Sequence, residues 1–471
     1  MSQADIAVIG LGVMGESLAR NFHSRGLTVA GLDYKAEAVD RFNAEWGDAR
    51  MRGHTDYAAL AAALKSPRKI LIMVTAGRAV DAVLAALTPH LDPEDIVIDG
   101  GNSHFPDTDR RVAETAGAFR FMGMGVSGGQ EGALVGPAMM PGGDEAAYAE
   151  LKPILESAAA VSDSGPCVDW CGRGSAGHFV KMVHNGIEYG DMQLIAEVAT
   201  LMREGMSMSP PAIRRTFLRW NTGLLASFLI EITAGIVAAK DPRGEGPLLD
   251  AILDVAGQKG TGRWTAIGAI KLGVPLPTIT AAVDARALSA LKSIRVQAAA
   301  LLSGEPVGLS GVSVEDLEAA LYVAKLMSYT QGFAMLRAGA AERDYGTDLA
   351  AVARIWKAGC IIRAAFLDDV YAAFRTDPDL PLLLLDPHFA DQLRPRLPAL
   401  RRVVARSAEA GIPTPALSAS LAYFDTLTRP RGSANIIQAQ RDWFGAHTYR
   451  RVEAPDVPVH TDWSEVAQLE D

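Results

Sequence analysis

The first turn of the chain constrains its fold more than any other feature. A short apolar run, Ile6 to Ile9, leads directly into GLGVMG at residues 10–15, and apolar residues at helical spacing follow. This order predicts a strand, a glycine-rich turn and a helix, a unit in which a pyrophosphate can approach the backbone at the helix N-terminus. A second predicted strand, Leu27 to Leu32, ends at Asp33, near the distance at which an acidic side chain accepts the ribose hydroxyls of a dinucleotide.

The first third of the chain alternates short apolar runs with Ala-rich segments. The runs are Ile70 to Val74, Ile96 to Ile98 and Phe119 to Met122, and the Ala-rich segments 57–64 and 78–87 have helical character. This alternation predicts a doubly wound α/β sheet, in which ligands bind beyond the carboxyl ends of the strands. Three glycine-punctuated loops lie at or near predicted strand ends and offer backbone donors as well as Asn102 and Ser127: DGGNS at 99–103, GVSGG at 125–129 and PGG at 141–143.

After about residue 176 the strand signals fade, and Ala/Leu-rich amphipathic segments extend to about residue 427. This part is predicted to be helical and internally duplicated. WNTG at 220–223 is matched by WKAG at 356–359, and GVPLP at 273–277 is matched by GIPTP at 411–415. The two intervals, 136 and 138 residues, agree closely enough to favour an internal repeat over chance.

One predicted helix, at 177–193 (GHFVKMVHNGIEYGDMQ), combines apolar periodicity with an unusual polar face. Its polar residues recur at i, i+3, i+4 and i+7: Lys181, His184, Asn185 and Glu188. Seven residues advance a helix by ~10 Å, so Lys181 and Glu188 are spaced to flank a small substrate. A solvated polar face is the structural alternative. The corresponding segment of the second copy, around Lys325, lacks the His, Asn and Glu, so only the first copy is predicted to perform chemistry.

Composition and charge limit the other functional classes. The formal net charge of −10 argues against a nucleic-acid partner, because no long-range field would attract phosphate backbones. Cys167, Cys171 and Cys360 are too few for a disulfide framework and lack the paired spacing of a zinc site, so we interpret them as reduced structural thiols. The sequence shows no basic leader and no apolar run long enough for a membrane span. We expect a cytoplasmic protein with no membrane partner and no metal site.

A loop at 429–433 breaks the helical pattern, and a tail follows to the end of the chain. Its segment 438–447 (QAQRDWFGAH) is too rich in specific polar and aromatic groups for a spacer. We therefore expect the tail to dock, within its own subunit or on a neighbour.

Together these motifs resemble those of the 6-phosphogluconate dehydrogenases, decarboxylating, in their long homodimeric form. The resemblance covers nearly the whole chain and rests on GLGVMG, DGGNS, GVSGG and the 177–193 stretch, with AGQKGTG at 256–262 and IQAQRD and FGAHTY in the tail. It implies a Rossmann dinucleotide-binding domain at 1–176, a duplicated all-helical substrate and dimerisation domain at 177–430, and a tail at 431–471 that reaches the partner subunit. The implied activity is oxidative decarboxylation of 6-phosphogluconate to ribulose 5-phosphate and CO2, with reduction of NAD(P), in the pentose phosphate pathway.

The resemblance also implies residue roles. Lys181 would be the general base and Glu188 the general acid, in a reaction that needs no metal ion. Substrate would be bound by Asn102, Ser127, Gly128, Gly129, His184, Asn185, Tyr189, Lys259, Thr261 and Arg286, joined by Arg441 and His447 from the partner's tail. The cofactor would be bound by Gly10, Gly12, Val13, Met14, Gly15, Asp33, Tyr34, Lys35, Val74, Thr75, Ala76 and Asn102. A phosphate on a net-acidic protein needs a cationic pocket, and Lys259, Arg286 and Arg441 supply cations of the required kind.

Two departures from the family pattern bear on the cofactor. NADP-preferring members commonly have Asn-Arg-Thr after the second strand, where this chain has Asp33, Tyr34 and Lys35. A carboxylate at Asp33 would repel a 2′-phosphate and favour the ribose hydroxyls of NAD, although Lys35 could offset the repulsion. Thr75 replaces an expected lysine. The family resemblance implies NADP, and these residues favour relaxed or NAD-leaning specificity.

Two other functions fit part of the pattern. A dehydrogenase acting on a smaller β-hydroxy acid, such as hydroxyisobutyrate, would share GLGVMG, GVSGG and a Lys-containing helix, but it would not need the phosphate cluster or the duplicated second half. A dinucleotide-binding scaffold or redox sensor is also possible on this fold, because fold alone does not determine function. That hypothesis predicts a missing acid or base, and the sequence contains both.

Overall fold

A computed structural model describes residues 3–302, 304 and 307–466 of the chain. The described chain divides into two compact units, Met1–Leu421 and Ala422–Asp471, so the second begins before the tail boundary expected at residue 431. Each unit is described by itself.

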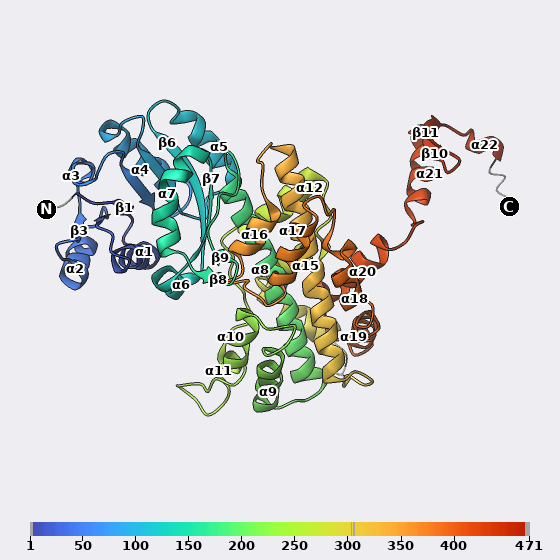
Figure 1. The fold of residues 1–471 in the computed structure, drawn as a ribbon. Coiled ribbons are helices and arrows are strands. Elements are labelled where there is room, and N and C mark those ends of the chain that lie inside the picture. Colours follow the sequence, from blue (N-terminus) through green and yellow to red (C-terminus); the bar gives the residue numbers. More distant parts are fainter. Residues whose placement is uncertain (1–2, 303, 305–306, 467–471) are drawn as a thin grey trace. The chain divides into compact units, whose positions relative to one another are not determined.

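The N-terminal part of the first unit is a Rossmann-like sheet, as the sequence predicted (Figure 1). Within the described residues seven strands form it in the order β3-β2-β1-β4-β5-β6-β7. All neighbours are parallel except β6 and β7, and the order reverses between β1 and β4, where such sheets bind ligands. The strands are β1 (Ile6–Ile9), β2 (Val29–Leu32), β3 (Met51–His54), β4 (Lys69–Ile72), β5 (Ile96–Asp99), β6 (Arg120–Ser127) and β7 (Ala138–Gly142).

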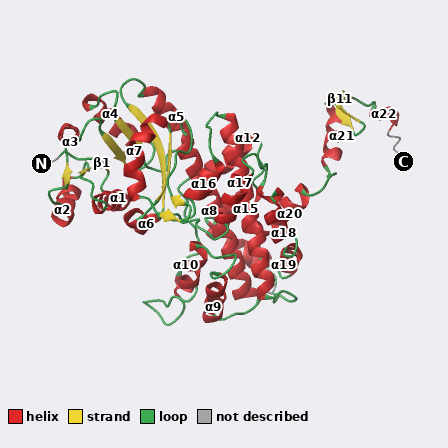
Figure 2. Cartoon of the chain, viewed as in Figure 1, coloured by secondary structure: helices red, strands yellow, loops and turns green. Residues whose placement is uncertain are grey.

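Helices cover both faces of this sheet (Figure 2). They are α1 (Val13–Ser24), α2 (Ala36–Trp46), α3 (Tyr57–Ala63), α4 (Arg78–Leu87) with the short η1 (Thr88–His90), α5 (Phe105–Glu114), α6 (Gly129–Val135) and α7 (Glu145–Ala158), before a small hairpin of β8 (Val161–Ser162) and β9 (Gly165–Pro166). Alternate residues of each strand point to opposite faces, so Ile6 and Val8 join one apolar core, and Ala7 and Ile9 join the other.

The structure corrects three details of the predicted sheet. The sequence analysis missed β3 and β7, because β3 is an edge strand without an apolar run and β7 contains Pro141 and ends at Gly142. It also took GVSGG for a loop at a strand end, whereas Gly125 to Ser127 lie inside β6. The PGG segment likewise begins inside β7 rather than after a parallel strand.

The rest of the first unit is a large helical part, again as predicted. Two long helices, α8 (Ala176–Thr200) and α15 (Val314–Glu342), run side by side at its centre (Figure 1). The other elements are η2 (Leu201–Gly205), α9 (Pro210–Trp220), α10 (Phe228–Ile236), α11 (Leu248–Ala251), α12 (Thr261–Leu272), α13 (Pro277–Ser289), α14 (Lys292–Leu302), α16 (Leu349–Ile355), α17 (Leu367–Thr376), η3 (Leu383–Leu385), α18 (Pro387–Leu393), α19 (Leu397–Glu409) and the first half of α20 (Pro415–Leu427). Among the described helices, none combines the length and apolar character needed to cross a membrane.

The two predicted copies meet through equivalent residues. Ser227 and Ala364 form an isolated antiparallel bridge, flanked by hydrogen bonds from Phe228 N to Arg363 O and from Ala365 N to Ala226 O. Residues 226–228 of the first copy therefore pair with 363–365 of the second, at nearly the same interval as the sequence repeats. Gly273 and Gly411, the repeated glycines after α12 and α19, both have positive φ, at 66° and 70°. In these hydrogen bonds each copy donates one N–H to the other and accepts one in return. Such a reciprocal pair is expected when two duplicated segments are related by a pseudo-twofold axis.

The second unit is a small fold around one buried carboxylate. It contains α21 (Ala434–Gly445), a hairpin of β10 (Tyr449–Arg451) and β11 (Ala454–Val459), and α22 (Trp463–Val466). Asp442 accepts hydrogen bonds from Thr448 N at 2.8 Å and Trp463 Nε1 at 2.9 Å, and it contacts His460 Nδ1 at 3.0 Å. Burial raises the pKa of Asp442, but hydrogen bonds from His460, Thr461 N and Trp463 outweigh burial and hold it at about 2. Residues 467–471 of the predicted tail lie outside the described residues.

Candidate active site

The polar face of α8 is buried rather than solvated. Lys181, His184 and Asn185 are 6%, 0% and 7% exposed, and Glu188 is partly exposed. Glycines allow the helix this degree of burial, because a β-carbon at Gly186 would lie 2.5 Å from Thr265 Cγ2 on α12. The solvated-face alternative is therefore excluded.

His184 connects the acid and base candidates of this helix. Its Nδ1 lies 3.3 Å from Lys181 Nζ and 3.8 Å from Glu188 Oε2. The same nitrogen is 3.1 Å from Asn185 Oδ1. The four residues predicted to share a face thus form one continuous polar cluster.

Burial moves the pKa values of this cluster toward those of working acids and bases. It lowers the pKa of the Lys181 ammonium from its ordinary value, an effect that the Glu188 carboxylate opposes. It raises the pKa of Glu188, which Lys181 and Arg286 oppose. It lowers the pKa of His184 strongly, so the imidazole is neutral. Burial therefore favours the neutral amine of Lys181 and the protonated carboxyl group of Glu188, which lie close together.

Strand β6 lies directly against α8. A β-carbon at Gly125 would stand 2.3 Å from Lys181 Cβ, and one at Gly123 would stand 2.6 Å from His178 Nδ1. Glycine at alternate positions of β6 therefore lets α8 approach the sheet, and this approach brings Ser127 close to His184. Ser127 Oγ is 3.2 Å from His184 Nε2, and Gly128, at φ +128°, precedes α6 without a side-chain cap.

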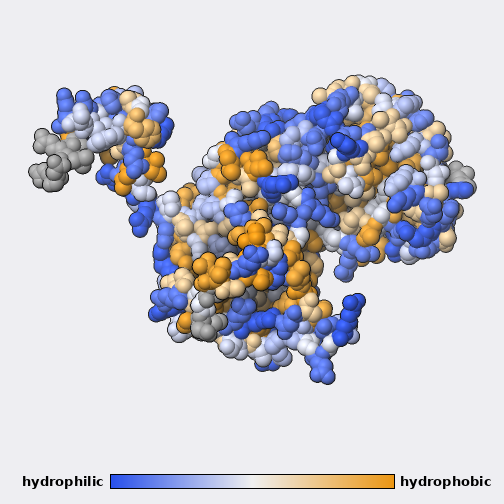
Figure 3. Space-filling model, turned by 180° about the vertical axis from the view of Figure 1, so that it is seen from behind, coloured by the Kyte–Doolittle hydropathy of each residue, from blue (hydrophilic) through white to orange (hydrophobic). Residues whose placement is uncertain are grey.

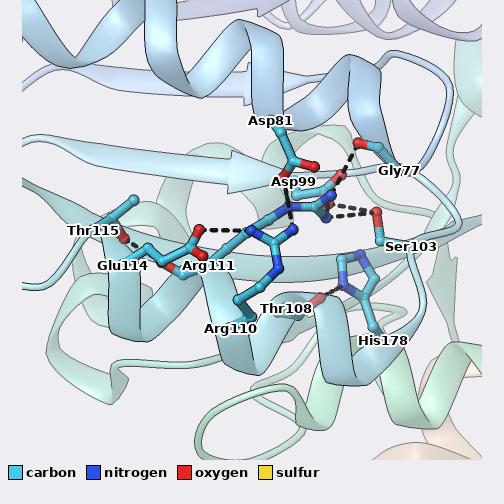
Figure 4. Close-up of polar contacts among 10 residues, drawn as sticks. All are labelled: Gly77, Asp81, Asp99, Ser103, Thr108, Arg110, Arg111, Glu114, Thr115 and His178. Carbon is cyan, nitrogen blue, oxygen red and sulfur yellow. Dashed lines mark hydrogen bonds and ion pairs between the residues drawn. The ribbon is translucent and has the colours of Figure 1, made fainter.

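The DGGNS loop is fixed by a buried charge network (Figure 4). Asp99, at the end of β5, accepts hydrogen bonds from Gly101 N at 3.0 Å and Ser103 Oγ at 2.6 Å. Arg111 on α5 lies 3.3 Å from Asp99 Oδ2 and bonds Asp81 at 2.8 Å. Asn102, held between these anchored residues, is exposed and available to a ligand. The sequence analysis did not identify Arg111 or Asp81 as parts of this loop's support.

The same region connects the loop to α8. Thr108 Oγ1 on α5 lies 2.6 Å from His178 Nδ1 on α8, a contact that Figure 4 also draws. In addition, the ring of His104, just after the loop, stacks on Trp264 of α12 with centroids 4.6 Å apart. Asn102 is therefore positioned from both the sheet and the helical part.

The GLGVMG turn fits a dinucleotide phosphate. Gly10 has φ +96° and lies so close to Met73 O that a β-carbon would meet it at 2.5 Å, and a β-carbon at Gly15 would lie 1.8 Å from Gly10 O. Gly12 differs, because a β-carbon there would meet nothing within 4 Å and the residue is exposed. The N-terminus of α1 at Gly12 has no side-chain cap, so its backbone N–H groups remain available to an anion.

The residues expected near the adenosine ribose lie at the ends of β2 and β4. Asp33 Oδ2 accepts a hydrogen bond from Leu11 N at 2.9 Å, so this carboxylate also braces the glycine turn. Tyr34 and Lys35 are exposed, with Lys35 Nζ 5.4 Å from the centre of the Tyr34 ring. Thr75 is exposed in the segment after β4, with Val74 and Ala76 beside it partly buried.

The predicted phosphate-binding residues are only partly brought together within the first unit. The Arg286 guanidinium on α13 stacks 3.6 Å from the centre of the Tyr189 ring on α8. Thr261, at the start of α12, is buried, and Gly262 packs against the same tyrosine ring. Lys259 is exposed just before α12. Arg441 and His447 belong to the second unit, where Arg441 donates to Gln438 Oε1 at 3.1 Å.

Comparison with known proteins decides the family. A model of the NAD binding domain of 6-phosphogluconate dehydrogenase matches residues 5–172, and a model of the 6-phosphogluconate dehydrogenase C-terminal domain matches residues 177–463. The chain belongs to the 6-phosphogluconate dehydrogenase family. It is an oxidoreductase of this family, and the resemblance predicted from its motifs is confirmed.

Individual 6-phosphogluconate dehydrogenases resemble it over nearly their whole length. The decarboxylating enzyme of Lactococcus lactis is 47% identical, with 98% of this chain and 99% of that protein covered. The NADP(+)-dependent decarboxylating enzyme of Bacillus subtilis is 46% identical over 98% of this chain and its own full length. The solved Plasmodium falciparum 6-phosphogluconate dehydrogenase, studied with NADP+ and with 6-phosphogluconate, superposes with a TM-score of 0.94 at 41% identity, covering 98% of this chain and 100% of that one.

Sequence reasoning about this member of the family missed Cys360. The prediction that the cysteines are reduced is consistent with three free, buried thiols, but Cys360 is more than a packing residue. Its Sγ lies 2.9 Å from His184 Nε2, and the next residue, Ile361, donates its N–H to Ser127 Oγ at 3.3 Å. One feature of the sequence could have drawn attention to Cys360: it directly follows the repeated WKAG motif of the second copy.

Proposed function

We propose that this protein oxidatively decarboxylates 6-phosphogluconate to ribulose 5-phosphate and CO2, with reduction of NADP or NAD, in the pentose phosphate pathway. One observation supports the chemistry above all others. Lys181, whose pKa is lowered, and Glu188, whose pKa is raised, both lie near Nδ1 of the same neutral histidine. Base and acid are therefore available without a metal ion.

Lys181 acts first as the general base. An ordinary lysine, with a pKa of about 10.4, is almost wholly protonated at neutral pH, so a base role requires the lowering that burial causes here. Neutral Lys181 takes the proton of the C3 hydroxyl. When bound, the nicotinamide supplies the acceptor for the C3 hydride.

Lys181 and Glu188 then share the carbon–carbon cleavage. The 3-keto acid loses its carboxylate as CO2 because the keto oxygen accepts the electron pair. Protonated Lys181 stabilises the developing enolate, which is the electrostatic task that a metal ion performs in other decarboxylases. Burial raises the pKa of Glu188, which favours its protonated form, and Glu188 delivers a proton to C1 of the enediol.

The remaining predicted residues hold the two ends of the sugar acid. Asn102, Ser127, Gly128, Gly129, His184 and Asn185 are proposed to bind its carboxylate and hydroxyl groups. Tyr189, Lys259, Thr261 and Arg286 are proposed to bind the 6-phosphate. The stack of Arg286 on Tyr189 supports this assignment, because it pre-orients a cation beside the catalytic helix.

The turn at 10–15 is proposed to bind the dinucleotide through Gly10, Gly12, Val13, Met14 and Gly15. The open space at Gly12 and the uncapped start of α1 support this. NADP is the cofactor indicated by the Bacillus and Plasmodium relatives. We propose that NAD is used as well, because the carboxylate of Asp33 disfavours a 2′-phosphate and Thr75 supplies no cation.

We also propose a homodimer in which each tail completes the partner's site. Apolar side chains gather on the surface of the helical part (Figure 3), where a groove of about 510 Å³ lies between α8, α9 and α10. Ile232 and Ile236 line that groove and are 37% and 47% exposed. On the tail helix α21, Ile436 and Phe444 are 60% and 73% exposed. Apolar surface of this kind favours burial against another chain.

The cytoplasmic location expected from the sequence remains a prediction.

The reaction is tested by initial rates with 6-phosphogluconate and each of NAD and NADP. Reduced cofactor and released CO2 are followed together, and equal amounts of both are expected. If neither product appears, the assignment of the phosphate pocket is wrong. A smaller β-hydroxy acid such as hydroxyisobutyrate is the comparison substrate, and its preferential oxidation would overturn the proposal.

A further inference from the structure

The second repeat contributes a loop to the site on the first repeat. This loop, Gly359–Ile362, has four separate anchors in the structure. Gly359 O accepts a hydrogen bond from Ala138 N at 2.9 Å, and Ile361 N donates to Ser127 Oγ at 3.3 Å. Tyr329 OH on α15 donates to Ile362 O at 2.7 Å. The fourth contact is that of Cys360 Sγ with His184 Nε2, at 2.9 Å.

From this arrangement we propose that Cys360 is a positioning residue for catalysis, which holds His184 in the tautomer that has its proton on Nδ1 and thereby keeps Lys181 ready to act as a base. The proposal rests on the function proposed above and assigns a role in it to the second repeat.

The hydrogen-bonding capacity of the groups around Nε2 supports this tautomer. Ser127 Oγ already accepts the N–H of Ile361, so its own hydrogen is available to donate, either to Nε2 at 3.2 Å or to the Cys360 sulfur that it also contacts. Burial raises the pKa of the Cys360 thiol to about 12, so its sulfur also keeps a hydrogen at neutral pH. Two donors face Nε2, which must then accept.

The proton on Nδ1 has a consequence for Lys181. Nδ1 lies 3.3 Å from Lys181 Nζ and 3.1 Å from Asn185 Oδ1. An N–H there is compatible with a neutral amine, whose lone pair can accept it, but it opposes the N–H groups of an ammonium. The tautomer therefore disfavours protonated Lys181 and adds to the effect of burial.

Other titratable groups act on the same cluster and are unchanged when Cys360 is replaced. They are Glu188 and Asp191 on α8, Arg286 on α13, and Lys325 and Tyr329 on α15. Asp191 and Lys325 form a buried pair at 2.6 Å, so they add little net charge to the site. Cys360 also acts directly on Lys181, where a thiolate would raise the pKa of the lysine. Loss of that direct effect would lower the pKa of Lys181, whereas loss of the contact with His184 should raise it, so the direction of the change in the pH profile distinguishes the two routes.

The test compares Cys360→Ala, Cys360→Ser and Cys171→Ala in the full-length enzyme, by the pH dependence of kcat/KM for 6-phosphogluconate. Cys171 is a matched control, because it is also a buried free thiol and, among the described residues, the hydrogen-bond partner of its Sγ is Asp169 O, at 3.6 Å. Alanine at 360 removes one donor to His184 Nε2. The acidic limb of the kcat/KM profile should therefore move to higher pH by about one unit. At a fixed pH on that limb, kcat/KM should fall about tenfold. Serine restores a donor and should return most of the shift, and Cys171→Ala should retain the parental limb.

A parental acidic limb in Cys360→Ala overturns the proposal, and so does a shift that serine fails to reverse. If Cys360→Ala does not fold, the tautomer is tested directly in the unaltered protein. Nitrogen-15 NMR of the histidine-labelled protein should show an unprotonated Nε2 for His184, assigned by its loss in His184→Asn. A protonated Nε2 refutes the tautomer even if the protein does not oxidise 6-phosphogluconate, which separates this failure from failure of the proposed function.

Discussion

Gly125 on β6 and Lys181 on α8 are in direct contact, such that a β-carbon at Gly125 would lie 2.3 Å from the β-carbon of Lys181. Real carbon atoms do not approach so closely, so the strand and the helix could not keep this spacing with any larger residue. The proposed base therefore owes its position to the absence of a side chain on the neighbouring strand.

Gly125→Ala should consequently displace Lys181 and abolish most of the activity. Overpacking of this kind costs about 1–3 kcal/mol of stability, and a base displaced by about 1 Å can lose about a hundredfold in rate. The measurements are kcat with 6-phosphogluconate and the thermal unfolding midpoint. Gly246→Ala is the control, because a β-carbon at Gly246 meets nothing within 4 Å. Normal kcat in Gly125→Ala would contradict the requirement for close packing.

Glu197 should make the stability of the protein depend on pH. Its carboxylate on α8 accepts the N–H groups of Ala416 and Leu417, at 2.8 and 2.9 Å, at the start of α20. Burial nevertheless raises its pKa to about 7. The folded state thus binds a proton more tightly than the unfolded state, so this contribution to stability is complete below about pH 4.5 and is lost as the pH rises to 7, by roughly 3 kcal/mol at most.

Glu197→Gln tests that sign, since the amide does not titrate. Unfolding midpoints measured from pH 4.5 to 8 should fall less steeply with rising pH in the variant than in the parent. Identical slopes would show that Glu197 titrates at its ordinary pKa despite its burial.

Asp33→Asn should raise kcat/KM for NADP relative to NAD. The substitution removes the negative charge that opposes a 2′-phosphate, while the amide oxygen can still accept the hydrogen bond from Leu11 N. Initial rates with both cofactors give the ratio, and Lys35→Ala should change it in the opposite direction. An unchanged ratio in Asp33→Asn would mean that other residues determine the preference.

The tail should serve the active site of the other subunit. When Lys181→Ala and Arg441→Ala chains are co-expressed with different tags and the mixed dimer is isolated, one of its two sites has both residues intact if tails cross, and about half the parental activity should appear. If each tail serves its own subunit, both sites of the mixed dimer are impaired and no activity is recovered. Each variant alone provides the baseline.

Truncation before Ile436 gives a second test of the tail. It should sharply weaken binding of 6-phosphogluconate and leave dinucleotide binding intact, since the glycine turn lies in the first unit. Isothermal titration with each ligand distinguishes the two effects. Unaltered affinity for the sugar acid would refute the role of Arg441 and His447.

Local patterns in the sequence predicted much of this protein. The glycine turn at 10–15 and the shared face of Lys181, His184 and Glu188 could be identified because both follow from the geometry of one strand or one helix. The family followed from the same motifs. Strands β3 and β7 were missed because edge strands need neither continuous apolar runs nor freedom from proline.

Other relationships were decided only by the tertiary structure. No local pattern indicates that Cys360 contacts His184, that Arg111 supports the loop after Asp99, or that Gly125 makes room for Lys181. Each of these contacts joins residues from different elements, and its energy depends on distances that the packing of those elements sets. The order of the residues sets which chemical groups the protein has and which faces of a helix or strand they share. Packing then sets which of those groups are buried, lose water and so acquire shifted pKa values.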